Sequence, residues 1–187
     1  IMILICAMMT SIAIVREKEM GTMEILLVSP MKPIYIVLSK IAPYFVLSCI
    51  NFATIILLSV FVLNVPVAGS FASLIVVSLI YIFVSLALGL LISTLTSSQL
   101  AAMMISGMAL MIPVMLLSGM IFPVENMPTW LQWISNFVPA RWYISAAKSI
   151  MIKGLGITSV LKELSVLSVM GITLLLISLK KFKIRLE

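Results

Sequence analysis

The sequence of 187 residues contains no histidine and no aspartate. Zinc proteases of the HExxH type, serine–histidine proteases and paired-aspartate proteases all need those side chains as ligand or base, so these classes are excluded. No glycine-rich loop followed by Lys-Ser or Lys-Thr is present, which excludes a P-loop for ATP. The sequence therefore predicts no catalytic, cofactor-binding or metal-binding residues in this chain.

Charge is scarce as well. Hydrophobic residues make up 63% of the chain and charged residues 10%, whereas soluble domains carry about 25% charged residues. Such a chain cannot cover its surface with polar groups, so lipid must be its main solvent. The net charge of +6 is not gathered on one face, which argues against a nucleic-acid partner. Cys6 and Cys49 lie in apolar stretches and predict no disulfide.

The apolar runs predict an all-α integral membrane protein, because only internally hydrogen-bonded helices satisfy the backbone at this spacing in hydrocarbon. The expected fold is a helical bundle in one transmembrane domain over 1–187, with complete spans at 34–63, 71–95, 100–121 and 157–179. Residues 1–15 are expected to be the end of a truncated span. Fifteen helical residues reach only about 22 Å, against a hydrocarbon core of about 30 Å.

The basic residues predict the orientation of these spans. Span parity places the charged segment 16–33 and the tail 180–187 on one side of the membrane, and the stretch 122–156 on the other. With Lys40 near the start of the next span, the first side holds eight Lys and Arg residues, and with Lys162 the second side holds four. Because cytoplasmic segments are enriched in Lys and Arg, we expect a multi-pass protein of the inner (cytoplasmic) membrane whose C-terminus is cytoplasmic.

Small and polar residues form two patterns within the spans. Ser85, Gly89 and Ser93 recur every four residues, so they share one helix face and predict close helix packing. Ser48, Asn51 and Thr54 follow at steps of three and form a polar stripe. That stripe fits either a substrate path or ordinary hydrogen bonding between helices, and we favour the second reading.

The stretch 122–156 predicts a short re-entrant or interfacial helical hairpin outside the cytoplasm. Trp130, Trp133 and Phe137 form an aromatic face typical of a helix at the membrane interface. Pro123, Pro128 and Pro139 supply breaks, and Arg141 lies in a second short segment. The aromatic face fits either a simple aromatic belt or a hairpin that shapes an exit.

Two motifs resemble a known family. The first is Arg16-Glu17-x-Glu19-x-Gly21-Thr22-x-Glu24-x-Leu26-Leu27-x-Ser29-Pro30, followed by Ser39-Lys40-x-x-Pro43-Tyr44. It resembles the coupling segment of ABC-2 type permeases, the membrane subunits of ATP-binding-cassette exporters. The second motif runs from Leu117-Ser118-Gly119 through Pro123 and Pro128 to Pro139-Ala140-Arg141-Trp142. Within the family, the combination looks most like the drug-efflux subgroup.

The resemblance implies the C-terminal portion of a six-span permease whose first span and large extracytoplasmic domain precede residue 1. It implies that the charged segment docks on a separate ATPase, which would bind ATP and Mg, and that a second permease, identical or different, completes the transporter. The residues expected to couple to the ATPase are Glu17, Glu19, Gly21, Thr22, Glu24, Leu27 and Pro30. An amphipathic helix lying in a partner's groove is an established mode of such docking.

The leading interpretation is thus a permease subunit that forms the substrate path for drugs or other amphipathic compounds. The alternative is a non-transporting membrane anchor or regulatory scaffold. An enzyme is the weakest interpretation, because the residues for chemistry are missing.

The predicted topology can be tested by cysteine labelling in a background lacking Cys6 and Cys49. A cysteine at Thr22 should be protected from an impermeant maleimide added to intact cells, whereas one in 122–156, for example at Ser135, should react. Labelling of both positions from outside would contradict the predicted orientation.

Overall fold

A computed structural model of the chain describes residues 2–21, 33–65 and 68–184. All regular elements in these ranges are helical, which confirms the predicted all-α fold class. The α-helices are α1 (Met2–Glu19), α3 (Pro33–Phe61), α4 (Phe71–Leu95), α5 (Gln99–Met104), α6 (Leu110–Leu117), α7 (Thr129–Ser135), α8 (Pro139–Met151) and α9 (Leu161–Ile184). The π-helical segment η1 covers Ile105–Ala109, and the 3₁₀ turns η2 and η3 cover Val124–Asn126 and Ile157–Val160.

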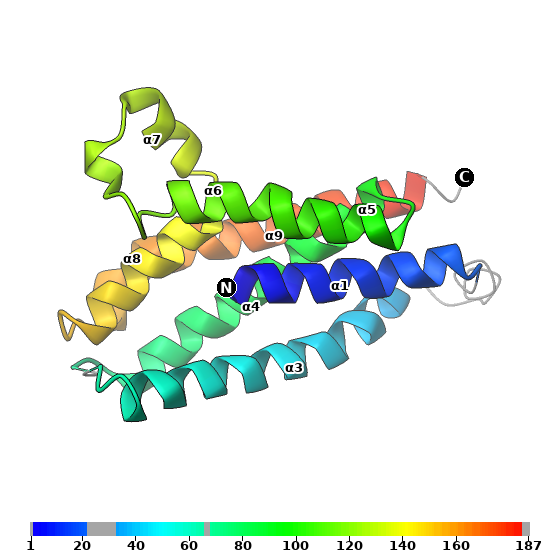
Figure 1. The fold of residues 1–187 in the computed structure, drawn as a ribbon. Helices are drawn as coiled ribbons and strands as arrows, with labels where there is room; N and C mark the ends of the chain where they lie inside the picture. Colours follow the sequence, from blue (N-terminus) through cyan, green and yellow to red (C-terminus); the bar gives the residue numbers. More distant parts are fainter. Residues whose placement is uncertain (1, 22–32, 66–67, 185–187) are drawn as a thin grey trace.

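Four stretches of the described chain are long and apolar enough to cross a membrane. They are Leu38–Phe61, Phe71–Leu95, Gln99–Leu117 and Ile157–Lys181. Their number agrees with the predicted bundle, and the third stretch combines α5, η1 and α6. The bundle is elongated, and α1 lies beside only part of the length of α3 (Figure 1).

Helix α4 is the centre of the bundle. In its most apolar stretch, 61% of the residues are buried, against 11%, 11% and 17% in the corresponding stretches of the other three candidate spans. Helices α1 and α9 make their most extensive contacts with α4. A Cβ atom on Gly89 would lie 2.6 Å from the carbonyl oxygen of Ala7, so only glycine permits this approach of α1. On the α9 side, a Cβ atom on Gly171 would lie 3.0 Å from the Phe83 ring.

The predicted small-residue face lies inside these contacts. Ser85, Gly89 and Ser93 are all buried. The Ser85 hydroxyl donates to the carbonyl of Tyr81 at 2.7 Å, and the Ser93 hydroxyl donates to the carbonyl of Leu90 at 2.6 Å. Each hydroxyl is therefore satisfied within its own helix, and the small side chains leave room for α1.

The third span departs from a regular α-helix. Pro113 has no N–H, and its ring would clash with the carbonyl of Ala109 in a regular helix. The π-helical η1 ends at Ala109, and a wider turn of this kind relieves such a conflict. The helix then ends at Leu117 and not at Ile121 as the sequence predicted. Gly119, with φ +78°, takes the left-handed conformation that commonly terminates helices.

The stretch after α6 contains two short helices, α7 and α8, joined at Asn136–Val138. Pro128 directly precedes α7, and Pro139 occupies the first turn of α8. The aromatic face is turned outward: Trp130, Trp133 and Phe137 are 63%, 74% and 79% exposed. Figure 1 shows α7 projecting from the end of the bundle. Its position at a membrane interface stays a prediction.

Ser135 is a poor labelling site because it is buried and its hydroxyl donates to the carbonyl of Leu117 at 2.5 Å. Thr129, exposed at the start of α7, is the better position for the extracytoplasmic cysteine.

The close approach of α1 to α4 predicts that Gly89→Leu destabilises the bundle. The leucine side chain would overlap the backbone of Ala7 and the side chain of Thr10, so we expect an overpacking cost of about 1–3 kcal/mol. Gly107→Leu is the matched control, because a Cβ atom at Gly107 meets nothing within 4 Å. Thermal unfolding of the purified full-length variants should show a lower Tm for the Gly89 variant alone. Equal Tm values would contradict the packing role.

Candidate functional site

The charged residues of α1 lie at one end of the bundle, which we call the charged end. There α1 ends, α3 begins, and residues 96–98 connect α4 to α5 (Figure 1). Three successive residues of α1, Glu17, Lys18 and Glu19, each contact a different neighbouring helix at this end.

Glu17 pairs with α3. Its Oε1 atom lies 2.5 Å from Nζ of Lys40. The two side chains are 24% and 38% exposed, so water screens the pair and its contribution is about 1 kcal/mol or less. Lys40 belongs to the first motif in the sequence, which did not identify this partner.

Lys18 interacts with the end of α4. Its ammonium group donates to the carbonyl oxygen of Ser93, in the last turn of that helix. The last carbonyls of a helix lack partners within it and carry partial negative charge. A lysine at this position therefore satisfies an acceptor and interacts favourably with the helix dipole.

Glu19 binds the start of α5. Its carboxylate accepts a hydrogen bond from the backbone N–H of Gln99 at 2.8 Å and another from the Gln99 side-chain amide. The Ser98 hydroxyl accepts from the N–H of Ala101 at 3.2 Å in the same first turn. The bonds from the Gln99 side chain and backbone lower the pKa of Glu19 below its ordinary value. The carboxylate thus stays ionised near neutral pH and caps the helix.

Helix geometry explains how consecutive residues contact three neighbours. Successive side chains leave an α-helix about 100° apart, so Glu17, Lys18 and Glu19 together cover about 200° of its circumference. This arc faces α3, α4 and α5 in turn. The end of α1 is thereby connected by polar contacts to α3, α4 and α5.

Only some of the residues expected to couple to an ATPase lie in the part of the chain that the structure describes. Glu17 and Glu19 make the contacts above within the chain, and Gly21, with φ +68°, ends α1 in the left-handed conformation. Thr22, Glu24, Leu27 and Pro30 lie outside the described residues. Docking of these residues on an ATPase stays a prediction.

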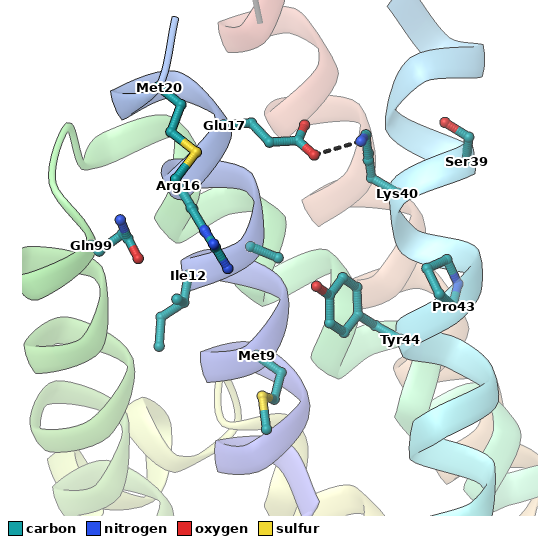
Figure 2. A pocket seen from close by; sticks show the side chains of 11 residues that line it. Met9, Ile12, Arg16, Glu17, Met20, Ser39, Lys40, Pro43, Tyr44 and Gln99 are labelled. Atoms are coloured by element: carbon teal, nitrogen blue, oxygen red, sulfur yellow. Dashed lines mark hydrogen bonds and ion pairs between the residues drawn. The ribbon is translucent and has the colours of Figure 1, made fainter. Parts of the chain in front are cut away.

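A hollow of about 630 Å³ lies over the remaining side of α1. Figure 2 shows α1 beneath it, with Lys40 and Tyr44 of α3 pointing toward α1 from one side and Gln99 on the other side. The hollow is lined by Met9, Ile12, Ala13, Arg16, Glu17, Met20, Ser39, Lys40, Pro43, Tyr44 and Gln99. Sequence reasoning did not predict this hollow, because its walls come from three helices.

The polar stripe of α3 is not directed at a single cavity. Ser48 is buried, Asn51 is half-buried and Thr54 is exposed, with its hydroxyl bonded to the Asn51 carbonyl at 2.7 Å. Residues at steps of three rotate by about 60° around a helix, so the stripe turns from the bundle interior to its surface. The structure thus does not bring the three side chains together.

The opposite end of the bundle contains a smaller polar hollow of about 360 Å³, bordered by Ser118, Arg141 and Lys148. Arg141 donates to the carbonyl of Gln132 at 3.1 Å and so joins α8 to α7. Tyr143 of α8 stacks on Tyr81 of α4, with ring centroids 4.1 Å apart. These contacts fix the hairpin to the bundle.

Among the residues that the structure describes, no group of three His, Cys, Asp or Glu side chains could hold a metal ion.

The comparisons with known proteins agree with this architecture. The family model described as "ABC-2 family transporter protein" matches residues 1–180. The "Probable multidrug ABC transporter permease YbhS" of Escherichia coli (strain K12) is 36% identical over 154 residues, which cover 82% of this chain and 41% of that protein. The "ABC transporter G family member 20" of Dictyostelium discoideum is 28% identical over 148 residues, covering 79% of this chain and 20% of that protein.

The "Inner membrane transport permease YhhJ" of Escherichia coli (strain K12) is 29% identical over 183 residues, which cover 96% of this chain and 48% of that protein. The chain therefore spans less than half the length of these curated relatives. No solved structure matches it. With the family model matched over nearly its whole length, the chain belongs to the ABC-2 family of transporter proteins.

Proposed function

We propose that this chain is the membrane part of a permease subunit of an ABC-2 exporter. It couples to a separate ATP-binding-cassette ATPase, which binds ATP and Mg, and works together with a second permease. The family match and the names of the bacterial relatives support this function. Those names also favour drug-like amphipathic compounds as substrates and the inner membrane as location.

The observation that carries the proposal is the triple attachment at the charged end. Glu17, Lys18 and Glu19 contact α3, α4 and α5 at the end of α1 that continues into residues 22–32. A displacement of that segment by the ATPase would move α1 first. The three contacts would then transmit the movement to α3, α4 and α5 together. A coupling mechanism requires such a connection, because the ATPase cannot contact helices inside the bilayer.

The strength of the attachments suits this task. The Glu17 and Lys18 contacts are polar and partly exposed, so each contributes on the order of 1 kcal/mol, and the Glu19 contact is exposed to water. The packing of α1 on α4 at Gly89 involves other residues than these contacts and does not require them. Removing one contact should therefore weaken the transfer of motion and leave the bundle folded.

The coupling role of the Glu17–Lys40 pair can be tested by exchanging its charges. Glu17→Lys and Lys40→Glu each place like charges together, so each should lower transport per ATP hydrolysed, while the double variant should recover much of the loss. We expect an interaction energy of about 0.5–2 kcal/mol between the two sites. The measurement is dye uptake and ATP hydrolysis by the full-length permease assembled with its ATPase in proteoliposomes.

Glu125→Lys is the matched control, because it reverses the same charge on an exposed residue at the opposite end of the bundle. Size-exclusion chromatography and Tm show whether each variant still assembles and folds. Unchanged coupling in both single variants would contradict the proposal. ATP hydrolysis without uptake by the wild-type complex would favour the scaffold interpretation.

A further inference from the structure

We propose that the hollow over α1 at the charged end binds an anionic amphiphile, a molecule with one acidic group and an apolar body. Arg16 would hold the acidic group, and the apolar side chains beside it would hold the body. This proposal goes beyond the coupling function and does not depend on it, because it concerns binding in the absence of ATP.

The hollow exists because of how α1 packs. The buried side of α1 faces α4, where Ala7 and Thr10 lie beside Gly89. Glu17 and Glu19 direct two other sides toward α3 and α5. Arg16 precedes Glu17 and therefore points about 100° away from it, to the side opposite α4. On that side no described helix covers α1, and α3 and α5 form the walls.

The volume of the hollow suits a small molecule. At about 630 Å³ it falls in the range of ligand sites, which is about 300–1,000 Å³. Much of its lining is apolar, with Met9 and Ile12 on α1 and Pro43 on α3. Methionine adapts to ligands of different shapes because its side chain is unbranched and polarizable.

Charge decides which ligand fits. Three charged side chains line the hollow, and two of them, Glu17 and Lys40, pair with each other. The guanidinium of Arg16 has no hydrogen bond or ion pair with any residue of the described ranges. In Figure 2 this side chain lies along α1 between Met20 and Ile12. Among the described residues, Arg16 is therefore the one charge lining the hollow that has no partner of opposite charge, which favours a carboxylate or phosphate.

A second polar group lies across the hollow from Arg16. Figure 2 shows the hydroxyl of Tyr44 directed from α3 toward α1. A phenol donates one hydrogen bond, so it can bind the same acidic group without adding charge. The position of the hollow at the end of the spans suits an amphiphile, whose acidic group stays near water while its body follows the helices into the apolar region.

The test measures binding of dansyl-aminoundecanoic acid and of its methyl ester to the full-length permease, purified without ATPase or nucleotide. The dansyl fluorescence should show the acid binding about tenfold more tightly than the ester, the usual worth of one charge-assisted hydrogen bond. Arg16→Gln should remove this preference by weakening only the acid, whereas Arg16→Lys should retain part of it.

Two further variants separate the site from general effects. Lys162→Gln removes the same charge at the far end of the bundle, on an exposed residue, and should leave both affinities unchanged. Ala13→Phe places a ring in the hollow and should weaken the acid and the ester alike. The Tm and the oligomeric state of each variant, Arg16→Gln included, are measured beside its affinities. A variant that differs from the wild type in either property is treated as misfolded and not as a test of the site.

Competition identifies the source of the ligand. Displacement of the acid by phosphatidylglycerol, but not by phosphatidylcholine, would assign the hollow to an acidic membrane lipid. Stimulation of the assembled ATPase by the acid, lost in Arg16→Gln, would assign it to a transported compound. Equal affinity for acid and ester, or an acid preference that survives Arg16→Gln, would overturn the proposal. So would the absence of any binding, as expected if another part of the full-length protein covers the hollow.

Discussion

The rest of the structure depends on the close approach of α1 to α4. In hydrocarbon, helices gain little from burying apolar groups, so packing distance decides which helices associate. Gly89 lets the backbone of Ala7 approach to a distance that any side chain would prevent. That contact places the end of α1 where Lys18 reaches the last turn of α4, and where Glu17 and Glu19 reach α3 and α5. The polar contacts at the charged end thus depend on the packing of α1 against α4 at Gly89.

The same packing creates both functions that we propose for this end of the bundle. Three sides of α1 are occupied by neighbouring helices, which suits the transfer of motion from residues outside the bundle. The fourth side, which carries Arg16, borders the hollow among the described residues, and this suits a ligand. Because Arg16 and Glu17 are adjacent in sequence, a ligand bound at the first would lie beside the Glu17–Lys40 pair. Binding and coupling therefore share one short segment of α1.

Much of the fold could be predicted from the sequence, since long apolar runs allow only helices in a membrane. The spacing of Ser85, Gly89 and Ser93 also indicated a packing face, because a four-residue repeat is a property of one helix. The partners of Glu17 and Glu19 could not be predicted, because Lys40 and Gln99 are 23 and 80 residues away. The π-helical turn before Pro113 and the hollow over α1 likewise depend on neighbouring helices, whose arrangement local patterns do not contain.

In the proposed coupling mechanism, α1 and α3 move together at the charged end. It is tested most directly by replacing Glu17 and Lys40 with cysteines in a full-length permease lacking Cys6 and Cys49, and joining them with a short bifunctional maleimide. Transport per ATP hydrolysed is then compared before and after cross-linking in the assembled complex. If the two helices move as one unit, the link should restore the coupling lost with the ion pair. If the link abolishes the remaining transport, the helices must separate during the cycle and the account is contradicted.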